Sequence, residues 1–338
     1  MTVCDAGEIV SMVAADRPIL VWGNPGIGKT ASIVAEAEAD GYKVFVLVGN
    51  CRAPEDFSGL PHFVDGITRY APQGWAVDAN RADKALVVFD ELTTSTPAVM
   101  AAMLRVVQER HVGDLPLGDH VRIVALANPP AVSGYLRALP PALANRFVHV
   151  DFGLDVDGWE AWMAANHRSD ALGPVLGFLR ARRDLLAPEP PLDTVSAGRA
   201  WPSPRSWDAA VAVAGDRAGW FGHVAAAVGV AAAGEFVAWL EAADLPDTTS
   251  VLADPGKVGW SKLRPDQLFA VLCSVVAAVN DDVSRRQAYR VVVVAGETAA
   301  DLGVAALSAL IAGDAGSPPF AELQPVYGPF LDRLQAAR

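Results

Sequence analysis

The feature that most constrains this chain is a glycine-rich loop between an apolar run and a helical pattern. Residues 23–30 read GNPGIGKT, directly after the apolar run ILVW at 19–22 and before a helical pattern over 31–39. Glycines let the backbone curl so that successive N–H groups point at a bound anion, at the positive end of the following helix. The loop therefore predicts a strand–loop–helix unit that binds phosphate groups, with Lys29 as their point charge. The residues predicted to form this site are Gly23, Asn24, Pro25, Gly26, Ile27, Gly28, Lys29, Thr30 and Ala31.

The first 150 residues repeat this alternation of apolar runs and helical patterns. Continuous apolar runs are typical of strands buried on both faces, and their alternation with helices predicts a parallel sheet of five strands. Two segments, 60–70 and 109–122, interrupt the alternation with a glycine-containing turn between β-prone flanks, so each is predicted to be an inserted hairpin. The predicted strands are 19–22, 44–48, 86–89, 121–127 and 147–150, and the predicted helices are 31–39, 74–81, 97–108 and 140–146.

From residue 159 onward the pattern becomes largely helical. We therefore expect an α/β core over residues 1–153, followed by an all-helical lid and C-terminal region over 154–338. The predicted helices are 159–167, 173–185, 206–214, 219–242, 265–279, 285–300 and 301–312.

Polar side chains follow two further apolar runs. Asp90 and Glu91 come after LVVF, and Asn128 comes after IVALA. Because the carboxyl ends of parallel strands meet at one edge of a sheet, these side chains are predicted to lie beside the loop at 23–30. Asp90 and the Thr30 hydroxyl suit a Mg²⁺ ion. Glu91 suits the polarisation of an attacking water, and Asn128 suits a hydrogen bond to the terminal phosphate or to that water.

Composition excludes some classes of protein. The 27 Lys and Arg against 39 Asp and Glu give a formal charge of −12, so we expect no nucleic acid as a partner. The longest uncharged apolar stretch, 218–234, is short and rich in Ala and Gly, which favours a buried helix over a membrane span. The odd, scattered cysteines Cys4, Cys51 and Cys273 favour a reducing cytoplasm.

Taken together, GNPGIGKT, LVVFDE, ALANP and LANRF resemble the motifs of the AAA+ ATPases, and among them the MoxR-like group. The resemblance covers about residues 19–205. It implies a P-loop fold with Walker A and Walker B motifs, bound ATP and Mg²⁺, and a ring that is usually a hexamer. It also implies a protein client that the ring remodels or activates. Such clients include partners with a von Willebrand factor A domain and proteins that receive a metal centre.

The same resemblance implies roles for individual residues. Asn128 corresponds to the sensor-1 position, and Arg146 in ANRF to the arginine finger that reaches a neighbouring subunit's nucleotide. Arg205 in WPSPR resembles the sensor-2 arginine, and Arg137 is a second finger candidate. The chain departs from the group after Glu91, where LTTS stands in place of INRA, and in the roughly 130 residues that follow Arg205.

Two other interpretations stay open at this point. One is an interaction scaffold locked by nucleotide, which Glu91 disfavours because a scaffold needs no water-polarising acid. The other is a nucleic-acid motor of the restriction type, which the acidic charge disfavours.

Overall fold

The chain divides into two units, each with its own hydrophobic core. The structure is a computed structural model that describes residues 2–13, 17–129, 139–313 and 318–336. The first unit comprises Met1–Leu154 and Glu189–Ala197, and the second comprises Asp155–Pro188 and Gly198–Arg338. The predicted boundary after residue 153 assigns all later residues to the helical region, whereas the contacts within the chain assign Glu189–Ala197 to the first unit.

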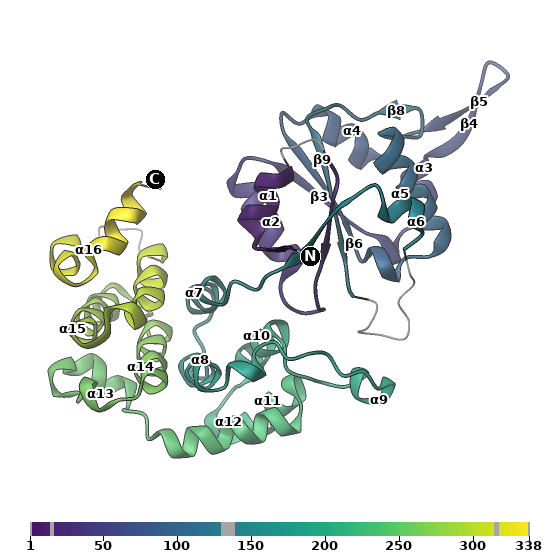
Figure 1. Cartoon of the computed structure of the whole chain (residues 1–338). Coiled ribbons are helices and arrows are strands. Elements are labelled where there is room, and N and C mark those ends of the chain that lie inside the picture. The colour runs from purple at the N-terminus through teal and green to yellow at the C-terminus, as the bar shows by residue number, and fades with distance from the viewer. Residues whose placement is uncertain (1, 14–16, 130–138, 314–317, 337–338) are drawn as a thin grey trace. The chain divides into compact units, whose positions relative to one another are not determined.

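A parallel sheet of six strands forms the centre of the first unit (Figure 1). The strand order is β1-β10-β2-β9-β6-β3, so β2 lies in the interior of the sheet between β10 and β9. The parallel α/β sheet is confirmed, and β1 is an edge strand that the sequence did not predict. The strands are β1 (Thr2–Cys4), β2 (Ile19–Trp22), β3 (Lys43–Val48), β6 (Ala85–Asp90), β9 (Val121–Ala127) and β10 (Val148–Phe152).

Both faces of this sheet are covered by helices. Successive residues of a strand point to opposite faces, so Val87 joins one apolar cluster and Val88 the other. Ile9 of α1 and Ile33 of α2 pack in the cluster with Val88, whereas Met103 of α5 packs in the cluster with Val87. Burial on both faces explains why the strands read as unbroken apolar runs. The helices of this unit are α1 (Ala6–Val13), α2 (Lys29–Ala39), α3 (Glu55–Ser58), α4 (Gly74–Arg81), α5 (Pro97–Glu109), α6 (Pro141–Ala144) and α9 (Thr194–Ala197).

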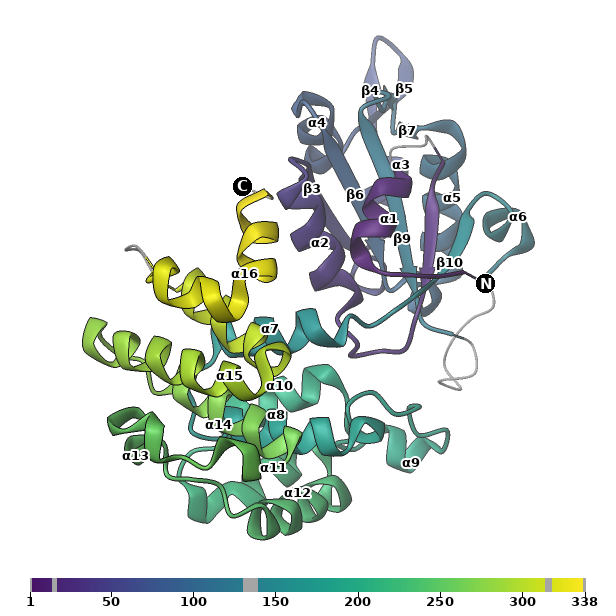
Figure 2. The ribbon, with the colours of Figure 1, turned by 60° about the vertical axis from the view of Figure 1, so that its left-hand side comes forward.

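The two predicted hairpins are present and lie against each other. Strands β4 (Leu60–Val64) and β5 (Ile67–Ala71) form an antiparallel ribbon that projects from the unit in Figures 1 and 2. Its turn uses Asp65 and Gly66, both with positive φ, which matches the twist of a two-residue hairpin. Strands β7 (His111–Val112) and β8 (Leu115–Pro116) form the shorter hairpin. The Asp114 amide donates to the Tyr70 carbonyl at 2.9 Å and thereby joins the turn between β7 and β8 to strand β5.

The second unit is built from helices throughout its described residues. The predicted helix 219–242 is in fact two helices, because Gly229 adopts a φ of 87° that no helix continues through. The predicted pair 285–300 and 301–312 forms α15, which bends at Ala299. The helices are α7 (Val156–Asn166), α8 (Leu172–Ala181), α10 (Pro204–Val213), α11 (Trp220–Val228), α12 (Val230–Ala243), α13 (Thr248–Ala253), α14 (Pro265–Ala277), α15 (Asp282–Ala312) and α16 (Phe320–Ala336).

Helix α15 is the one helix among the described residues that is long and apolar enough to cross a membrane by length and composition. The helix bends at Ala299, and many of its side chains are buried within the second unit. Val292, Ala306 and Leu310 of α15 pack in the core of the second unit together with residues of α14 and α16. These contacts are those of a core helix.

Two glycines let helices α8 and α14 approach closely. A Cβ at Gly173 would fall on the Ser274 hydroxyl and the Ala270 carbonyl, and a Cβ at Gly177 would lie 2.8 Å from the Asp266 carbonyl. Only glycine leaves room for these backbone contacts.

We predict that Gly173→Ala lowers the free energy of unfolding by about 1–3 kcal/mol, because the added methyl overpacks the contact between α8 and α14. The matched control is Gly234→Ala in α12, where a Cβ meets nothing within 4 Å. That change should raise the stability by about 0.5–1 kcal/mol through helix propensity. Urea denaturation followed by far-UV circular dichroism measures both, and equal effects of the two substitutions would contradict the packing argument.

Candidate nucleotide site

The loop at residues 23–30, called here the phosphate loop, leads from β2 into α2. Gly26 and Gly28 have φ values of 81° and 87°, a left-handed conformation that side chains rarely adopt. Gly23 is enclosed, because a Cβ there would lie 2.9 Å from Ile27 Cδ1 and 3.2 Å from Phe152 Cβ. The loop thus has glycine at the positions where its curled backbone and its close packing require it.

Lys29 lies at the centre of the phosphate loop and is only 8% exposed. Its ammonium donates hydrogen bonds to the Gly23 carbonyl at 2.6 Å, the Asn24 carbonyl at 2.9 Å and Asn128 Oδ1 at 3.0 Å. A buried ammonium needs oxygen partners of this kind, because leaving it unpaired would cost several kcal/mol. The same three N–H donors can bind phosphate oxygens instead, and these oxygens carry negative charge, whereas the carbonyls are neutral.

Thr30 and Asp90 face each other across the start of α2 and the end of β6. The Thr30 hydroxyl donates to Asp90 Oδ2 at 2.8 Å, and the backbone amide of Glu91 donates to Asp90 Oδ1 at 2.8 Å. A hydroxyl and a carboxylate are hard oxygen ligands, which suit Mg²⁺ completed by water and phosphate. The donor set therefore fits the metal that the sequence motifs predict.

Glu91 follows β6 in an unusual backbone conformation. Its φ of 57° and ψ of 39° are left-handed, which is rare for a residue with a side chain and is typical of functional sites. Its Oε2 accepts from the Thr94 hydroxyl at 3.1 Å and from Asn128 Nδ2 at 3.4 Å. The Ser95 hydroxyl holds its carbonyl at 3.0 Å. The carboxylate is thus fixed beside the end of β9.

Asn128 joins the two charged groups of the site. Its Oδ1 accepts from Lys29 and its Nδ2 donates to Glu91, so the amide orientation is set by both neighbours. Its backbone amide donates to Thr93 Oγ1 at 3.4 Å. The structure therefore brings together Lys29, Thr30, Asp90, Glu91 and Asn128, as the sequence predicted, at the carboxyl edge of three neighbouring parallel strands.

The remaining predicted loop residues lie around this cluster. Pro25 and Ile27 belong to the phosphate loop, and Ala31 lies in the first turn of α2 with an exposed side chain. Asn24 has a partner that the sequence gave no signal for: its Nδ2 donates to Glu189 Oε2 at 3.2 Å. Glu189 stands in a proline-rich stretch whose place in the first unit no local pattern predicts.

The Thr93, Thr94 and Ser95 hydroxyls were also missed. These residues belong to the 3₁₀ turn Leu92–Thr94 and its C-cap Ser95, which follow Glu91. The Thr94 hydroxyl donates to the side chain and the carbonyl of Glu91, the Ser95 hydroxyl donates to the same carbonyl, and Thr93 Oγ1 accepts from the Asn128 amide. A local signal exists, since Ser and Thr commonly bond to backbone groups two to four residues away. The replacement of INRA by LTTS thus puts side chains here that orient the acid.

Arg146 is not part of this cluster. It precedes β10, which runs parallel to β2, so it lies at the amino edge of the sheet, opposite the phosphate loop. The side chain is exposed, and its guanidinium donates to the Ala142 carbonyl at 3.4 Å. Within one copy of the chain, Arg146 therefore serves no role at the phosphate loop.

Arg205 lies in the second unit, and Arg137 lies outside the described residues. Arg205 is exposed in the first turn of α10, where Ser203 caps the helix by accepting from the Ser206 amide at 3.2 Å. The roles predicted for both arginines stay predictions.

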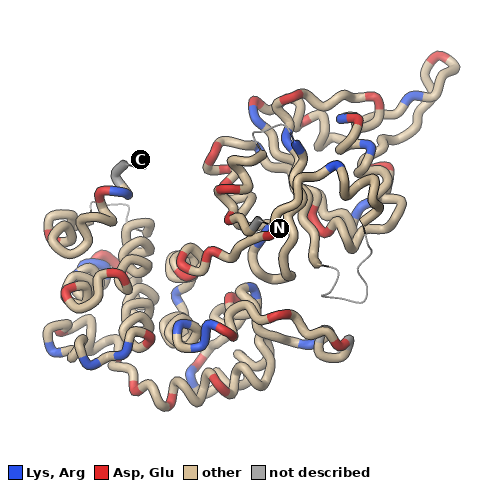
Figure 3. Tube along the Cα trace, in the orientation of Figure 1, with Lys and Arg blue, Asp and Glu red and all other residues tan. Residues whose placement is uncertain are grey.

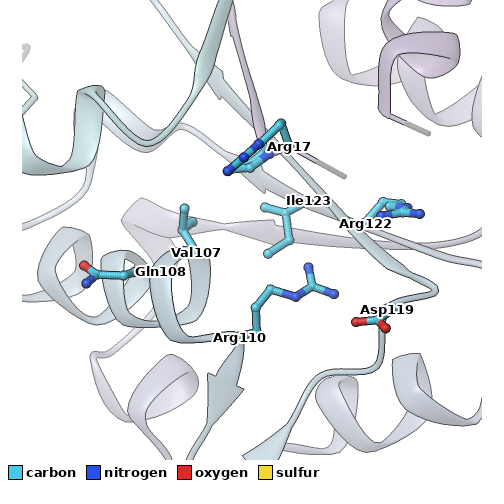
Figure 4. Close-up of a pocket in the computed structure, with 8 residues that line it drawn as sticks. Arg17, Val107, Gln108, Arg110, Asp119, Arg122 and Ile123 are labelled. Atoms are coloured by element: carbon cyan, nitrogen blue, oxygen red, sulfur yellow. The ribbon is translucent and has the colours of Figure 1, made fainter. Parts of the chain in front are cut away.

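A separate cavity of about 260 Å³ lies at the amino edge of the sheet (Figure 4). Arginine side chains from three places line it, namely Arg17 before β2, Arg110 after α5 and Arg122 in β9. Arg110 donates to the carbonyls of Gly118 and Val121, each at 2.7 Å, so this side chain also has a structural role. The cavity is distinct from the predicted nucleotide site.

Comparison with known proteins agrees with this geometry. Residues 18–147 match the family described as the AAA domain of the dynein-related subfamily. The first unit contains an AAA+ ATPase domain. This AAA+ domain includes the phosphate loop, the acids after β6, Asn128 and Arg146.

The chain is also similar to midasin from Giardia intestinalis, with 26% identity over 195 residues. That match covers 53% of this chain and 4% of midasin, so the chain spans a small part of this relative.

Two solved structures align with lower similarity. A candidate ATPase from Cytophaga hutchinsonii aligns with a TM-score of 0.32 and 21% identity, over 45% of this chain and 46% of that one. The RuvB Holliday junction branch migration motor of Thermotoga maritima aligns with a TM-score of 0.34 and 14% identity, over 75% of this chain and 78% of that one.

Proposed function

We propose that this protein is a MoxR-like AAA+ ATPase that hydrolyses ATP with Mg²⁺ in a hexameric ring and thereby remodels or activates a partner protein. The proposal rests on one observation, the separation between the cluster at the phosphate loop and Arg146. The cluster from Lys29 to Asn128 stands at the carboxyl edge of the sheet, while Arg146 stands exposed at the amino edge.

The residues of one copy perform the following steps. Lys29 leaves the carbonyls of the phosphate loop and binds the β- and γ-phosphates. Thr30 and Asp90 would hold Mg²⁺, and the bound ion would supply positive charge beside the phosphates. Glu91 orients and polarises the attacking water. The Asn128 side-chain amide donates to the Glu91 carboxylate and positions it relative to the γ-phosphate.

The position of Arg146 supports the proposed ring. An exposed arginine at the edge opposite the phosphate loop cannot serve its own nucleotide but can serve that of a neighbour. A head-to-tail contact of this kind closes into a ring when the rotation between copies permits. In this arrangement Arg146 stabilises the charge of the transferring phosphoryl group in trans. The resemblance of WPSPR to a sensor-2 motif supports Arg205 as a further residue of the mechanism.

The proposed protein client is supported by the β4–β5 hairpin. Phe63 is 79% exposed and Ile67 is 57% exposed, on a ribbon that projects away from the core. Exposed apolar side chains of this kind are typical of protein contacts. We propose a von Willebrand factor A-domain protein or a protein that receives a metal centre as the client.

Nucleic acid and membranes are not among the proposed partners. Lys and Arg are interspersed with Asp and Glu along both units (Figure 3), and the chain carries a formal charge of −12. We also propose a cytoplasmic location, which the free thiols of Cys4, Cys51 and Cys273 support.

We predict that Glu91→Gln leaves ATP affinity within about twofold but lowers turnover by about 10²–10⁴-fold, because the amide keeps the shape and loses the base. Glu109→Gln is the matched control, since this exposed acid forms an ion pair with Arg105 and lies outside the cluster. Calorimetric titration with ATP and a phosphate-release assay measure the two quantities. Normal turnover in Glu91→Gln would remove the glutamate from the mechanism.

We predict that Arg146→Ala binds ATP normally and loses about 10³–10⁵-fold in turnover, the usual effect of an arginine finger. The loss should be repaired by adding Glu91→Gln subunits, which cannot hydrolyse ATP but still donate Arg146 to a neighbour. Arg81→Ala, at an exposed arginine of α4, is the control. Full turnover of Arg146→Ala, or a loss that mixing does not repair, would overturn the ring arrangement.

A further inference from the structure

His149 connects the strand that enters the phosphate loop with the segment that presents Arg146. The indole N–H of Trp22 donates to His149 Nδ1 at 3.0 Å. On its other side, His149 Nε2 lies 2.8 Å from the Ala144 carbonyl. The Trp22 and His149 rings are also stacked, with centroids 6.0 Å apart and planes inclined by 30°.

The two partners determine which nitrogen of the His149 ring accepts a hydrogen bond and which donates one. An indole N–H can only donate, so Nδ1 must carry the lone pair. A carbonyl can only accept, so Nε2 must carry the hydrogen. His149 therefore accepts at Nδ1 and donates at Nε2, so that its ring links the Trp22 indole to the Ala144 carbonyl.

One end of this connection is fixed to the phosphate loop. Trp22 is the last residue of β2 and immediately precedes Gly23, whose amide donates to the Ala127 carbonyl at 3.2 Å. The carbonyl of Gly23 holds Lys29 at 2.6 Å. When Lys29 leaves this carbonyl for phosphate, the peptide next to Trp22 loses a charged partner.

The other end is fixed to the Arg146 segment. Ala144 is the last residue of α6, a helix of four residues, and its carbonyl also accepts from the Phe147 amide at 3.2 Å. Arg146 lies two residues after Ala144, and the Arg146 backbone amide donates to the Leu143 carbonyl at 3.1 Å. A helix of this length has few internal hydrogen bonds, and His149 adds one from a side chain of the sheet to the Ala144 carbonyl.

The sheet register makes this connection direct. His149 of β10 pairs with Leu20 of β2, and Trp22 lies two residues further along, so both side chains stand on the same face. The path from the phosphate loop to the Arg146 segment thus crosses a single pair of neighbouring strands.

We propose that His149 is a positioning residue that sets the place of Arg146 and couples it to the phosphate loop of the same copy. A subunit with phosphate in its own loop then presents its arginine differently to its neighbour, which makes hydrolysis around the ring cooperative. This inference rests on the proposed function in trans.

The test uses full-length His149→Phe, which keeps an aromatic ring against Trp22 but neither accepts nor donates, and Trp22→Phe, which keeps a smaller aromatic ring and removes the indole donor. Both should bind ATP with unchanged affinity and lose about 10- to 100-fold in turnover, the scale of a 1 Å misplacement. The Hill coefficient for ATP should fall toward one. His223→Phe is the matched control, because this exposed histidine of the second unit also bonds a backbone carbonyl, that of Ala214.

Mixing separates a misplaced finger from a damaged phosphate loop. Added Glu91→Gln subunits carry intact His149 and Arg146, so turnover of His149→Phe should rise as turnover of Arg146→Ala does. If added Glu91→Gln subunits restore the turnover of Arg146→Ala but not that of His149→Phe, the inference is overturned and the proposed function is not. Failure to repair Arg146→Ala would overturn both. If His149→Phe fails to fold, Trp22→Phe decides by the same mixture, and unchanged turnover in a folded variant also overturns the inference.

Discussion

The site depends on one constraint, the need of the Lys29 ammonium for oxygen partners in a place that is almost closed to water. In the absence of phosphate, two loop carbonyls and the Asn128 amide meet that need. The curl of the glycine-rich loop brings these carbonyls to the lysine, and the same curl turns the amides toward the ligand. A triphosphate can compete for the lysine because charged oxygens replace neutral ones. In the proposed mechanism, phosphate binding therefore exchanges the neutral oxygen partners of Lys29 for charged ones.

The parallel sheet places the two parts of the proposed site at its opposite edges. Strands that run in the same direction collect the loop, the acids and Asn128 at their carboxyl ends, and they place Arg146 at the other edge. No rearrangement of loops within the sheet brings the two edges together. In the proposed ring a second copy brings the two edges together, and the Trp22–His149–Ala144 connection gives each copy a short path between its own two edges.

The sequence predicted the strands of the core, both hairpins and the five clustered side chains, because burial on both faces and motif spacing are local signals. It did not predict β1, whose three residues at a sheet edge include the exposed Val3. It joined α11 to α12, since a single glycine in an Ala-rich run leaves the apolar pattern intact while its positive φ ends the helix. The contacts of Glu189 with Asn24 and of His149 with Trp22 link residues more than a hundred positions apart, and no local pattern encodes such contacts.

The most direct test is a structure of the full-length Glu91→Gln protein with ATP and Mg²⁺. The account predicts the triphosphate in the phosphate loop, with Lys29 Nζ moved from the Gly23 and Asn24 carbonyls onto phosphate oxygens. The metal should lie at Thr30 and Asp90. A triphosphate bound elsewhere, such as in the arginine-lined cavity at the amino edge, with Lys29 still on its carbonyls, would contradict it.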